Sequence, residues 1–303
     1  MTDRARYRGA LLGLLVGDVL GAPFEGHVGT VSEPVFAEVA SASTPLRYTD
    51  DTAMAITLAE SLLRCGGIDD DDLAQSFAHH WALAPERGYS NTTATLLARV
   101  HAGGAWTQPV AARGRATNGA AMRVAPVALY AAAEPAATIA LARRSARVTH
   151  PDPVAQAFAC VQAAAVAATL RHPPSATVEP DTFLVEISAW ADDPFVDHQL
   201  RLAGDVSVRG DPEEIAGKLG SGVLAAESVP AAICAFLSHP GSFRDAVTLA
   251  VRLGGDTDTT AAMTGSISGA LLGERTIPAA WIARAEAANH VRSLSDALYR
   301  SVR

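Results

Sequence analysis

Two short clusters of carboxylate and hydroxyl side chains, far apart in the chain, have the residue types of a metal site. Residues 49–52 read Thr-Asp-Asp-Thr, and residues 256–259 read Asp-Thr-Asp-Thr after a pair of glycines. Each cluster stands at the expected start of a helix, where a single cap would satisfy a free backbone N–H. The second carboxylate exceeds that need, and adjacent carboxylates repel each other unless protonated or bridged by cations. Oxygen-rich surroundings select hard cations such as Mg2+ or Mn2+, so we expect the clusters to meet as a metal site.

Two familiar kinds of acidic site do not fit these clusters. An EF-hand loop counted from Asp256 would need Gly at position six and Glu at position twelve, where the chain has Ala261 and Ile267. An isoprenoid diphosphate enzyme, which is also helical and Mg2+-dependent, would need an Asp-Asp-x-x-Asp pattern, but Asp50 and Asp51 are followed by Thr, Ala and Met. The ligands must therefore come from distant segments. No Cys or His spacing suggests zinc.

The composition predicts an all-α protein. The chain has 303 residues, of which 49% are hydrophobic and only 6% aromatic, and alanine is abundant. This favours closely packed helices, and we expect one compact helical bundle, a single domain over residues 1–303. The proline-rich stretch 172–180 is the one candidate boundary. The net charge is -8 and no run of Lys or Arg occurs, which argues against a nucleic-acid-binding surface.

Cysteine usage and hydropathy favour a soluble cytoplasmic protein. Cys65, Cys160 and Cys234 are odd in number and set among apolar residues, so we expect reduced core thiols. The arginine-rich start before an apolar run resembles a secretory signal, but Asp18 interrupts that run. We expect no other segment to approach the roughly 20 apolar residues that span a membrane.

Glycines at a four-residue spacing indicate two helices that pack closely. Gly9, Gly13, Gly17 and Gly21 form one stripe, and Gly265, Gly269 and Gly273 form another. Each glycine costs a helix about 1 kcal/mol relative to alanine, so packing around a buried centre must compensate.

Other segments also have helical signals. Helices are expected over residues 52–64, from near Asp69, over 153–171, and around Pro230, which could begin or kink its helix. The acidic run 69–72 is interpreted as a capped first turn rather than a metal cluster.

Three segments resemble the signatures of the ADP-ribosylglycohydrolases: Gly9 to His27, Tyr48 to Met54, and Gly254 to Gly273. They match in order and approximate spacing. Further similar segments are Arg87 to Tyr89, Asn118 to Arg123, Thr149-His150, Ser221 to Phe236 and Ile277 to Trp281. The last three of these, with residues 85–89, are most similar to the branch that cleaves ADP-ribose from serine and breaks down poly(ADP-ribose).

The resemblance implies an all-α bundle with two Mg2+ or Mn2+ ions at the bottom of a cleft. The six metal ligands carried over by position are Thr49, Asp50, Asp51, Asp256, Asp258 and Thr259. Glu25 matches a glutamate on a mobile loop that approaches the metals. Hydrolysis of the ribosyl bond passes through an oxocarbenium-like state, which carboxylates and a polarised water would stabilise. The proton would be transferred by Glu25 or by one of the aspartates Asp50, Asp51 and Asp256.

Residues expected to contact the substrate come from other similar segments: Gly88, Gly114, Arg115, Asn118 and His150. A structural role is the alternative for His150. Before Asn118 the chain lacks the aromatic residue that the serine-specific branch uses for adenine. Arg115 could pair with phosphate, and Trp106 or Tyr89 could replace the missing ring or belong to the core.

The resemblance leaves the acceptor open. An O-linked substrate (ADP-ribosylated serine, O-acetyl-ADP-ribose or poly(ADP-ribose)) is favoured over an arginine-linked one. A modified nucleic-acid end is a further alternative, as is a non-catalytic, crystallin-like relative that binds ADP-ribose. The partner is therefore an ADP-ribosylated protein or an ADP-ribose derivative, and a monomer is the default.

Overall fold

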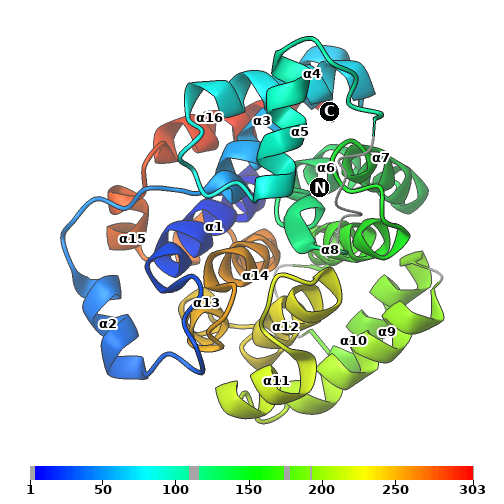
Figure 1. Cartoon of the computed structure of the whole chain (residues 1–303). Coiled ribbons are helices and arrows are strands. Elements are labelled where there is room, and N and C mark those ends of the chain that lie inside the picture. Colours follow the sequence, from blue (N-terminus) through cyan, green and yellow to red (C-terminus); the bar gives the residue numbers. More distant parts are fainter. Residues whose placement is uncertain (1–3, 109–115, 174–177, 192, 303) are drawn as a thin grey trace.

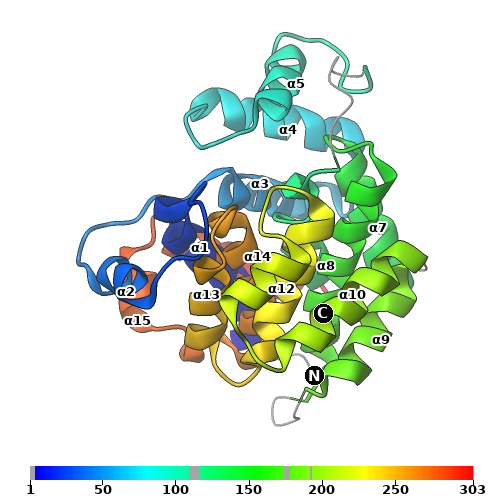
Figure 2. The same ribbon diagram turned by 60° about the horizontal axis from the view of Figure 1, so that its bottom comes forward.

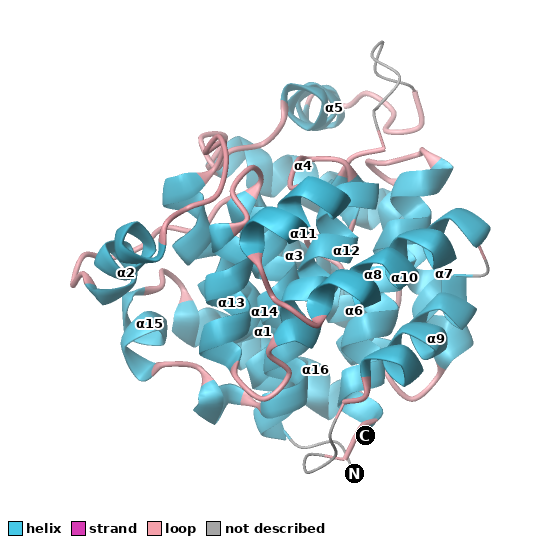
Figure 3. Cartoon of the chain, turned by 90° about the horizontal axis from the view of Figure 1, so that it is seen from below, coloured by secondary structure: helices cyan, strands magenta, loops and turns pink. Residues whose placement is uncertain are grey.

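Helices make up the regular structure of the protein. The computed structural model describes residues 4–108, 116–173, 178–191 and 193–302. Over these ranges it has sixteen α-helices and three short 3-10 helices, with isolated β-bridges in place of strands (Figure 3). The all-α expectation is confirmed. The single-domain assignment stays a prediction, because part of the stretch 172–180 lies outside the described residues.

The elements follow one another along the chain with short connections. Their bounds are α1 (Arg4–Gly21), η1 (Ala22–Phe24), α2 (Glu33–Ser41), α3 (Asp50–Cys65), α4 (Asp70–Leu83), α5 (Asn91–His101), η2 (Asn118–Ala120), α6 (Ala125–Ala131), α7 (Pro135–Arg147), α8 (Pro153–Arg171), α9 (Pro180–Ala191), α10 (Pro194–Ser207), α11 (Pro212–Leu219), α12 (Ala225–Ser238), α13 (Phe243–Arg252), α14 (Thr257–Leu272), η3 (Glu274–Thr276), α15 (Ala279–Arg284) and α16 (Ala288–Ser301).

Helices α1 and α14 lie side by side at the centre of the bundle (Figures 1 and 2). Their glycine stripes face each other so closely that a Cβ added at Gly13 would lie 2.1 Å from the carbonyl oxygen of Gly265, and one at Gly9 would lie 2.1 Å from that of Gly269. Every residue of α14 from Thr257 to Leu271 is buried. The expected close packing of two glycine-striped helices is therefore confirmed.

Helix α8 packs against α14, α12 and α7, and it corrects one expectation. By length and composition α8 could cross a membrane, although no such segment was expected outside the N-terminal region. In the protein, 83% of its most apolar window is buried against neighbouring helices. Because α8 packs against other helices on most of its surface, its sequence is rich in alanine and other apolar residues. Its hydropathy is therefore as high as that of a membrane span.

The helices expected from their caps begin close to the expected residues. Helix α3 starts at Asp50, two residues before the expected start, and the Thr49 side chain accepts a hydrogen bond from the Asp51 N–H. Helix α4 starts after Asp69, whose carboxylate caps the N–H of Asp72 as expected. Pro230 lies inside α12, which begins at Ala225, so Pro230 does not begin its helix.

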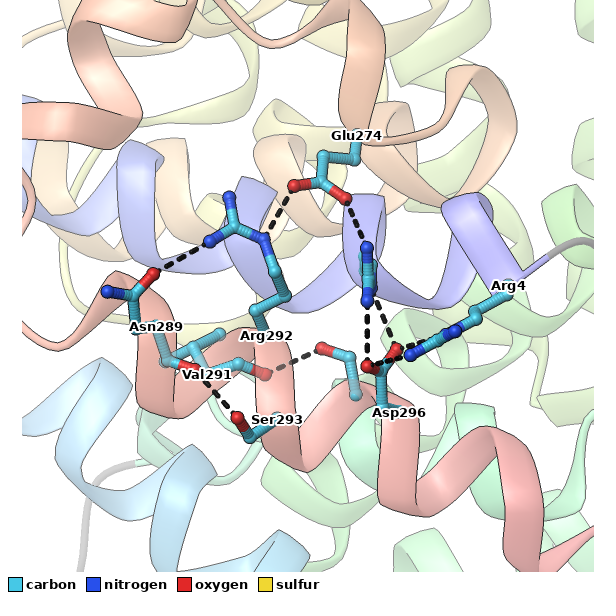
Figure 4. A network of polar contacts seen from close by, with 9 residues as sticks. Arg4, Glu274, Asn289, Val291, Arg292, Ser293 and Asp296 are labelled. Atoms are coloured by element: carbon cyan, nitrogen blue, oxygen red, sulfur yellow. Dashed lines mark hydrogen bonds and ion pairs between the residues drawn. The ribbon is translucent and has the colours of Figure 1, made fainter.

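An ion-pair network ties the N-terminal end of α1 to α16 (Figure 4). Asp296 accepts hydrogen bonds from both Arg4 and Arg8, and these arginines hold its pKa well below the usual range. Glu274 accepts from Arg292 at 2.7 Å and lies 3.4 Å from Arg8. The network anchors the end of α1 opposite to Asp18.

The cysteines agree only in part with the expectation of core thiols. Cys160 and Cys234 are buried, and burial raises the pKa of the Cys160 thiol to about 11. Cys65 is exposed, which contradicts the expectation. It is the last residue of α3, where Gly66 turns the chain away with a φ of 67°, so its side chain falls outside the core.

We predict that Gly13→Ala destabilises the protein by about 1–3 kcal/mol or more, because the new methyl group must push α1 and α14 apart. Gly217→Ala in α11 is the matched control, since its Cβ would meet no atom within 4 Å. That change should be neutral or stabilising by up to about 1 kcal/mol. Urea unfolding of both variants checks the prediction. Equal stability of the two variants would contradict it.

Candidate active site

The two acidic clusters lie together at the starts of α3 and α14. The Thr259 hydroxyl donates to Asp51 Oδ2 at 3.3 Å, across a sequence separation of 208 residues. Asp50 and Asp51 occupy the first turn of α3, Asp256 occupies the N-cap position of α14 without a capping hydrogen bond from its side chain, and Asp258 lies in the first turn of α14. Free N–H groups and the helix dipole favour negative charge at both positions. Helix geometry thus concentrates the carboxylates in one place.

Asp18 of α1 supports this centre, and the sequence analysis did not assign it a role there. Its fully buried carboxylate accepts hydrogen bonds from four groups of Thr49 and Thr52: the Thr49 N–H (3.0 and 3.1 Å to the two oxygens) and hydroxyl (2.9 Å), and the Thr52 N–H (3.1 Å) and hydroxyl (2.5 Å). Burial raises its pKa to about 6. The available signal was a lone carboxylate within the glycine-striped apolar run.

The buried carboxylates are arranged unfavourably for one another. Burial, followed by the charges of Asp18 and Asp256, raises the pKa of Asp50 to about 8. Burial and Asp258 raise the pKa of Asp51 well above its usual value. The Asp258 pKa is likewise raised, by burial and then by Asp256. This concentration of like charge is relieved either by protonation of the carboxylates or by bound cations.

The donor set fits divalent cations. Asp51 Oδ1 and Asp258 Oδ1 are buried and have no hydrogen-bond partner among the described residues. A buried carboxylate oxygen without a partner is costly, and the neighbouring donors Thr49 and Thr259 already give their protons to carboxylates. All six expected ligands offer oxygen, the ligand atom preferred by Mg2+ and Mn2+.

Glu25 lies at the solvent-exposed edge of the centre. One oxygen of its carboxylate and one oxygen each of Asp256 and Asp258 all lie within 4.8 Å of one another. Burial raises the pKa of Glu25, and the negative charge of Asp256 raises it further. Glu25 follows η1 and is exposed, so it faces both the acidic centre and the solvent.

The loop that carries Glu25 is held against the second acidic cluster by backbone contacts. The Gly26 N–H donates to the Gly255 carbonyl at 2.8 Å, and the Gly255 N–H donates to the His27 carbonyl at 2.9 Å. Gly254 and Gly255 have φ values of 73° and 69°, and a Cβ on Gly254 would lie 1.9 Å from the carbonyl oxygen of Gly29. The glycine pair is therefore required both by conformation and by space.

Asn118 contacts Asp256 directly. Its side-chain amide donates to Asp256 Oδ2 at 2.6 Å and to the Ser228 hydroxyl at 3.0 Å. The Asp256 N–H donates in turn to the Ser221 carbonyl at 2.7 Å. Asn118 is buried and starts η2, so the structure places it as an orienting group for Asp256. Its expected contact with substrate stays a prediction.

His150 lies behind the Asn118 segment. It is 9% exposed, and its two ring nitrogens contact the hydroxyls of Thr149 (2.8 Å) and Thr117 (3.1 Å). Burial and the nearby Arg123 lower its pKa to about 3, which keeps the imidazole neutral. A Cβ added at Gly119 would lie 2.8 Å from His150 Cε1, so the ring supports the Asn118 turn.

The other expected substrate residues occupy different places. Gly88 is exposed with a φ of 91°, and a Cβ there would lie 3.6 Å from Asp50 Oδ1, which puts it beside the acidic centre. Gly114 and Arg115 lie outside the described residues. Tyr89 packs against the hydrophobic core, and Trp106 donates from its indole to Asp71 at 2.7 Å.

Comparisons with known proteins agree with this arrangement. The sequence profile of the ADP-ribosylglycohydrolase family matches residues 1–303. "ADP-ribosylhydrolase ARH3" of Mus musculus is 32% identical, with 98% of this chain and 91% of the relative covered. The protein of the same name from Xenopus tropicalis is 30% identical, with 98% and 95% covered.

A solved structure gives the same result at the level of the fold. The structure titled "ADP-ribosylglycohydrolase-related protein complex" superposes with a TM-score of 0.79 at 30% identity and covers 100% of both chains. The match over the full length of the chain, together with the converging acidic clusters, shows that this protein belongs to the ADP-ribosylglycohydrolase family and is a glycohydrolase.

Proposed function

We propose that the protein hydrolyses the bond between the anomeric carbon of an ADP-ribose unit and an oxygen-linked acceptor, such as serine, an acetyl group or another ADP-ribose unit. The observation that carries the proposal is the meeting of the two acidic clusters with Glu25 at their edge. The similarity to ADP-ribosylhydrolases along nearly the whole chain supports it. An arginine-linked substrate is the alternative, which the assay below distinguishes.

Two divalent cations, Mg2+ or Mn2+, belong to this proposal. Thr49, Asp50, Asp51, Asp256, Asp258 and Thr259 would together hold them. The unpartnered oxygens of Asp51 and Asp258 support these assignments. Thr49 gives its hydroxyl proton to Asp18 and Thr259 gives its proton to Asp51, which leaves hydroxyl lone pairs for a cation. When bound, the cations would offset the carboxylate charge and act as Lewis acids toward the ribose oxygens.

Other residues of the chain position the expected ligands, transfer the proton and stabilise the charge that develops on the ribose. Asp18 and Asn118 hold Thr49 and Asp256 in place by hydrogen bonds. We assign proton transfer to Glu25, because it borders both the carboxylates and the solvent, and because burial and the charge of Asp256 raise its pKa in the direction that favours a general acid. The carboxylates stabilise positive charge that develops on the ribose ring as the bond breaks.

Release of free ADP-ribose tests the proposed activity. The substrates are serine-linked, arginine-linked, O-acetyl and polymeric ADP-ribose, each with Mg2+, Mn2+ or EDTA. We expect metal-dependent release from an O-linked substrate and its loss in Asp256→Ala, with folding checked by circular dichroism. Release from the arginine-linked substrate alone would favour the alternative acceptor. Binding of ADP-ribose without release from any substrate would reject hydrolysis of these linkages.

We predict that Glu25→Gln lowers kcat by about 10²–10⁴-fold, because the amide cannot transfer the proton. Cation affinity should stay within a few-fold of the wild type, as the six expected ligands remain. Steady-state kinetics and calorimetric cation titration measure the two quantities. Glu38→Gln, an exposed change on α2, is the matched control and should leave both unchanged. Wild-type turnover of Glu25→Gln would remove Glu25 from the mechanism.

We also predict that cations control stability against pH. The folded pKa values of Asp18 and Asp50, about 6 and about 8, lie above the unfolded value near 3.9, so in EDTA the stability that these two groups contribute is present at low pH and is lost as pH rises through these values. A cation at 100 times its Kd should restore about 2.7 kcal/mol at neutral pH. Thermal unfolding between pH 7 and 9, above the range in which the buried His150 makes an opposing contribution, with and without Mg2+, tests this. A cation-free protein that gains stability over that range would contradict the prediction.

A further inference from the structure

A buried arginine lies behind the turn that starts at Asn118, and the proposed reaction does not use it. Arg123 is fully buried. Its Nη1 donates to the Gly119 carbonyl at 2.8 Å, and its Nη2 donates to the Thr149 hydroxyl at 2.8 Å and to the Ser145 carbonyl at 3.2 Å. These partners are neutral, and no carboxylate is hydrogen-bonded to Arg123 among the residues that the structure describes. Burial lowers its pKa, but not far enough to remove its charge at neutral pH.

Stability alone is a weak reason for an arginine at this position. Removing a guanidinium from water is costly, and neutral acceptors compensate this cost less well than a carboxylate does. The Nε atom of Arg123 is also buried without a hydrogen-bond partner among the described residues. An apolar side chain of similar volume would avoid both costs. It would not supply N–H groups in fixed directions, which is what the planar guanidinium provides.

The Nη1 group of Arg123 holds the backbone directly after Asn118. Asn118 and Gly119 belong to the short 3-10 helix η2, and hydrogen bonds within such helices have poorer geometry than those of an α-helix. The Gly119 carbonyl accepts its bond from the guanidinium instead. This bond limits rotation of the backbone on the C-terminal side of Asn118.

The Nη2 group acts on the other side of Asn118 through three hydrogen bonds in a row. Arginine can only donate, so the Thr149 hydroxyl accepts from Arg123. The acceptor that the described residues offer to the Thr149 proton is His150 Nδ1, at 2.8 Å. The proton of the neutral imidazole is then on Nε2, which donates to the Thr117 hydroxyl at 3.1 Å. Thr117 directly precedes Asn118, so both neighbours of Asn118 are tied to one guanidinium.

We propose that Arg123 is a positioning residue of the active site, which fixes the backbone on both sides of Asn118 and so directs the Asn118 amide to Asp256. That amide donates to Asp256 Oδ2 at 2.6 Å, a bond that a small rotation of the turn would lengthen. Asp256 is an expected cation ligand, so the proposal rests on the function proposed above. Arg123 acts only through Gly119 and Thr149 and does not take part in the chemistry.

Two substitutions separate this role from a general contribution to folding. Arg123→Lys keeps the charge but has one ammonium nitrogen, which cannot donate in two fixed directions. Thr149→Val keeps the shape and leaves Arg123 in place, but it removes the hydroxyl that links Arg123 to His150. We expect each to weaken Mg2+ or Mn2+ binding roughly tenfold in calorimetric titration and to lower kcat by a similar factor. Thr149→Ser, which restores the hydroxyl, should recover the wild-type values within a few-fold.

Arg6→Lys is the matched control. Arg6 is also buried and donates to backbone carbonyls, those of Ala270 and His172 at 2.8 Å, but it lies near the N-terminal start of α1, away from the acidic centre. This variant should lose stability in thermal unfolding and keep the cation affinity of the wild type. Wild-type cation affinity in both Arg123→Lys and Thr149→Val, or an equal loss in Arg6→Lys, would overturn the proposal.

Nitrogen-15 NMR of the His150 ring tests the hydrogen-bond order without cation or substrate, with the signals assigned by their loss in His150→Ala. We expect the proton on Nε2 in the wild type and a shift of the Nδ1 signal in Thr149→Val, where Nδ1 loses its donor. A proton on Nδ1 in the wild type would overturn the proposal. If the wild type binds no cation, the function proposed above fails, and the proton position of His150 still decides whether Arg123 acts on Thr117 in this way.

Discussion

The close approach of α1 and α14 is the constraint on which the active site depends. With glycine at the contact points, the backbones come near enough that added methyl groups would overlap carbonyl oxygens on the opposite helix. This packing extends to Gly21, where a Cβ would lie 2.5 Å from the Cα of Asp258. Asp18, one turn before Gly21, then holds the start of α3. The packing of this one helix pair thus places the two acidic clusters next to each other.

The carboxylates of the acidic centre repel one another, and the protein alone provides no positive charge among the described contacts that would offset this repulsion. Carboxylates are drawn to helix N-termini by free N–H groups, but their mutual repulsion and burial raise their pKa values. Residues around the site fix the positions of the carboxylates. Asn118 donates a hydrogen bond to Asp256, and the turn that carries Asn118 packs against the His150 ring. Rigid support of this kind keeps the oxygens together in the absence of any attraction among them.

The sequence was informative where a pattern depends on local chemistry. Glycine spacing predicted the central helix contact, and paired aspartates with hydroxyls predicted a shared acidic centre. Residues whose role depends on distant partners were missed. Nothing near Asp18 in the sequence indicates that it would cap α3, and nothing near Asn118 indicates that it would donate a hydrogen bond to Asp256. Cys65 was misplaced because it follows the apolar part of α3, whereas its position at the end of that helix is exposed.

The central pairing of α1 with α14 also has a consequence for how the chain folds during synthesis. The Gly9 to Gly269 contact joins segments that lie far apart in the sequence and therefore leave the ribosome at different times. Until α14 emerges, the apolar surface of α1 lacks its main partner, and contacts of such long range form slowly because a long loop must close first. The apolar surface of α1 therefore stays uncovered by α14 until that helix has been made. The acidic centre can assemble only after that point.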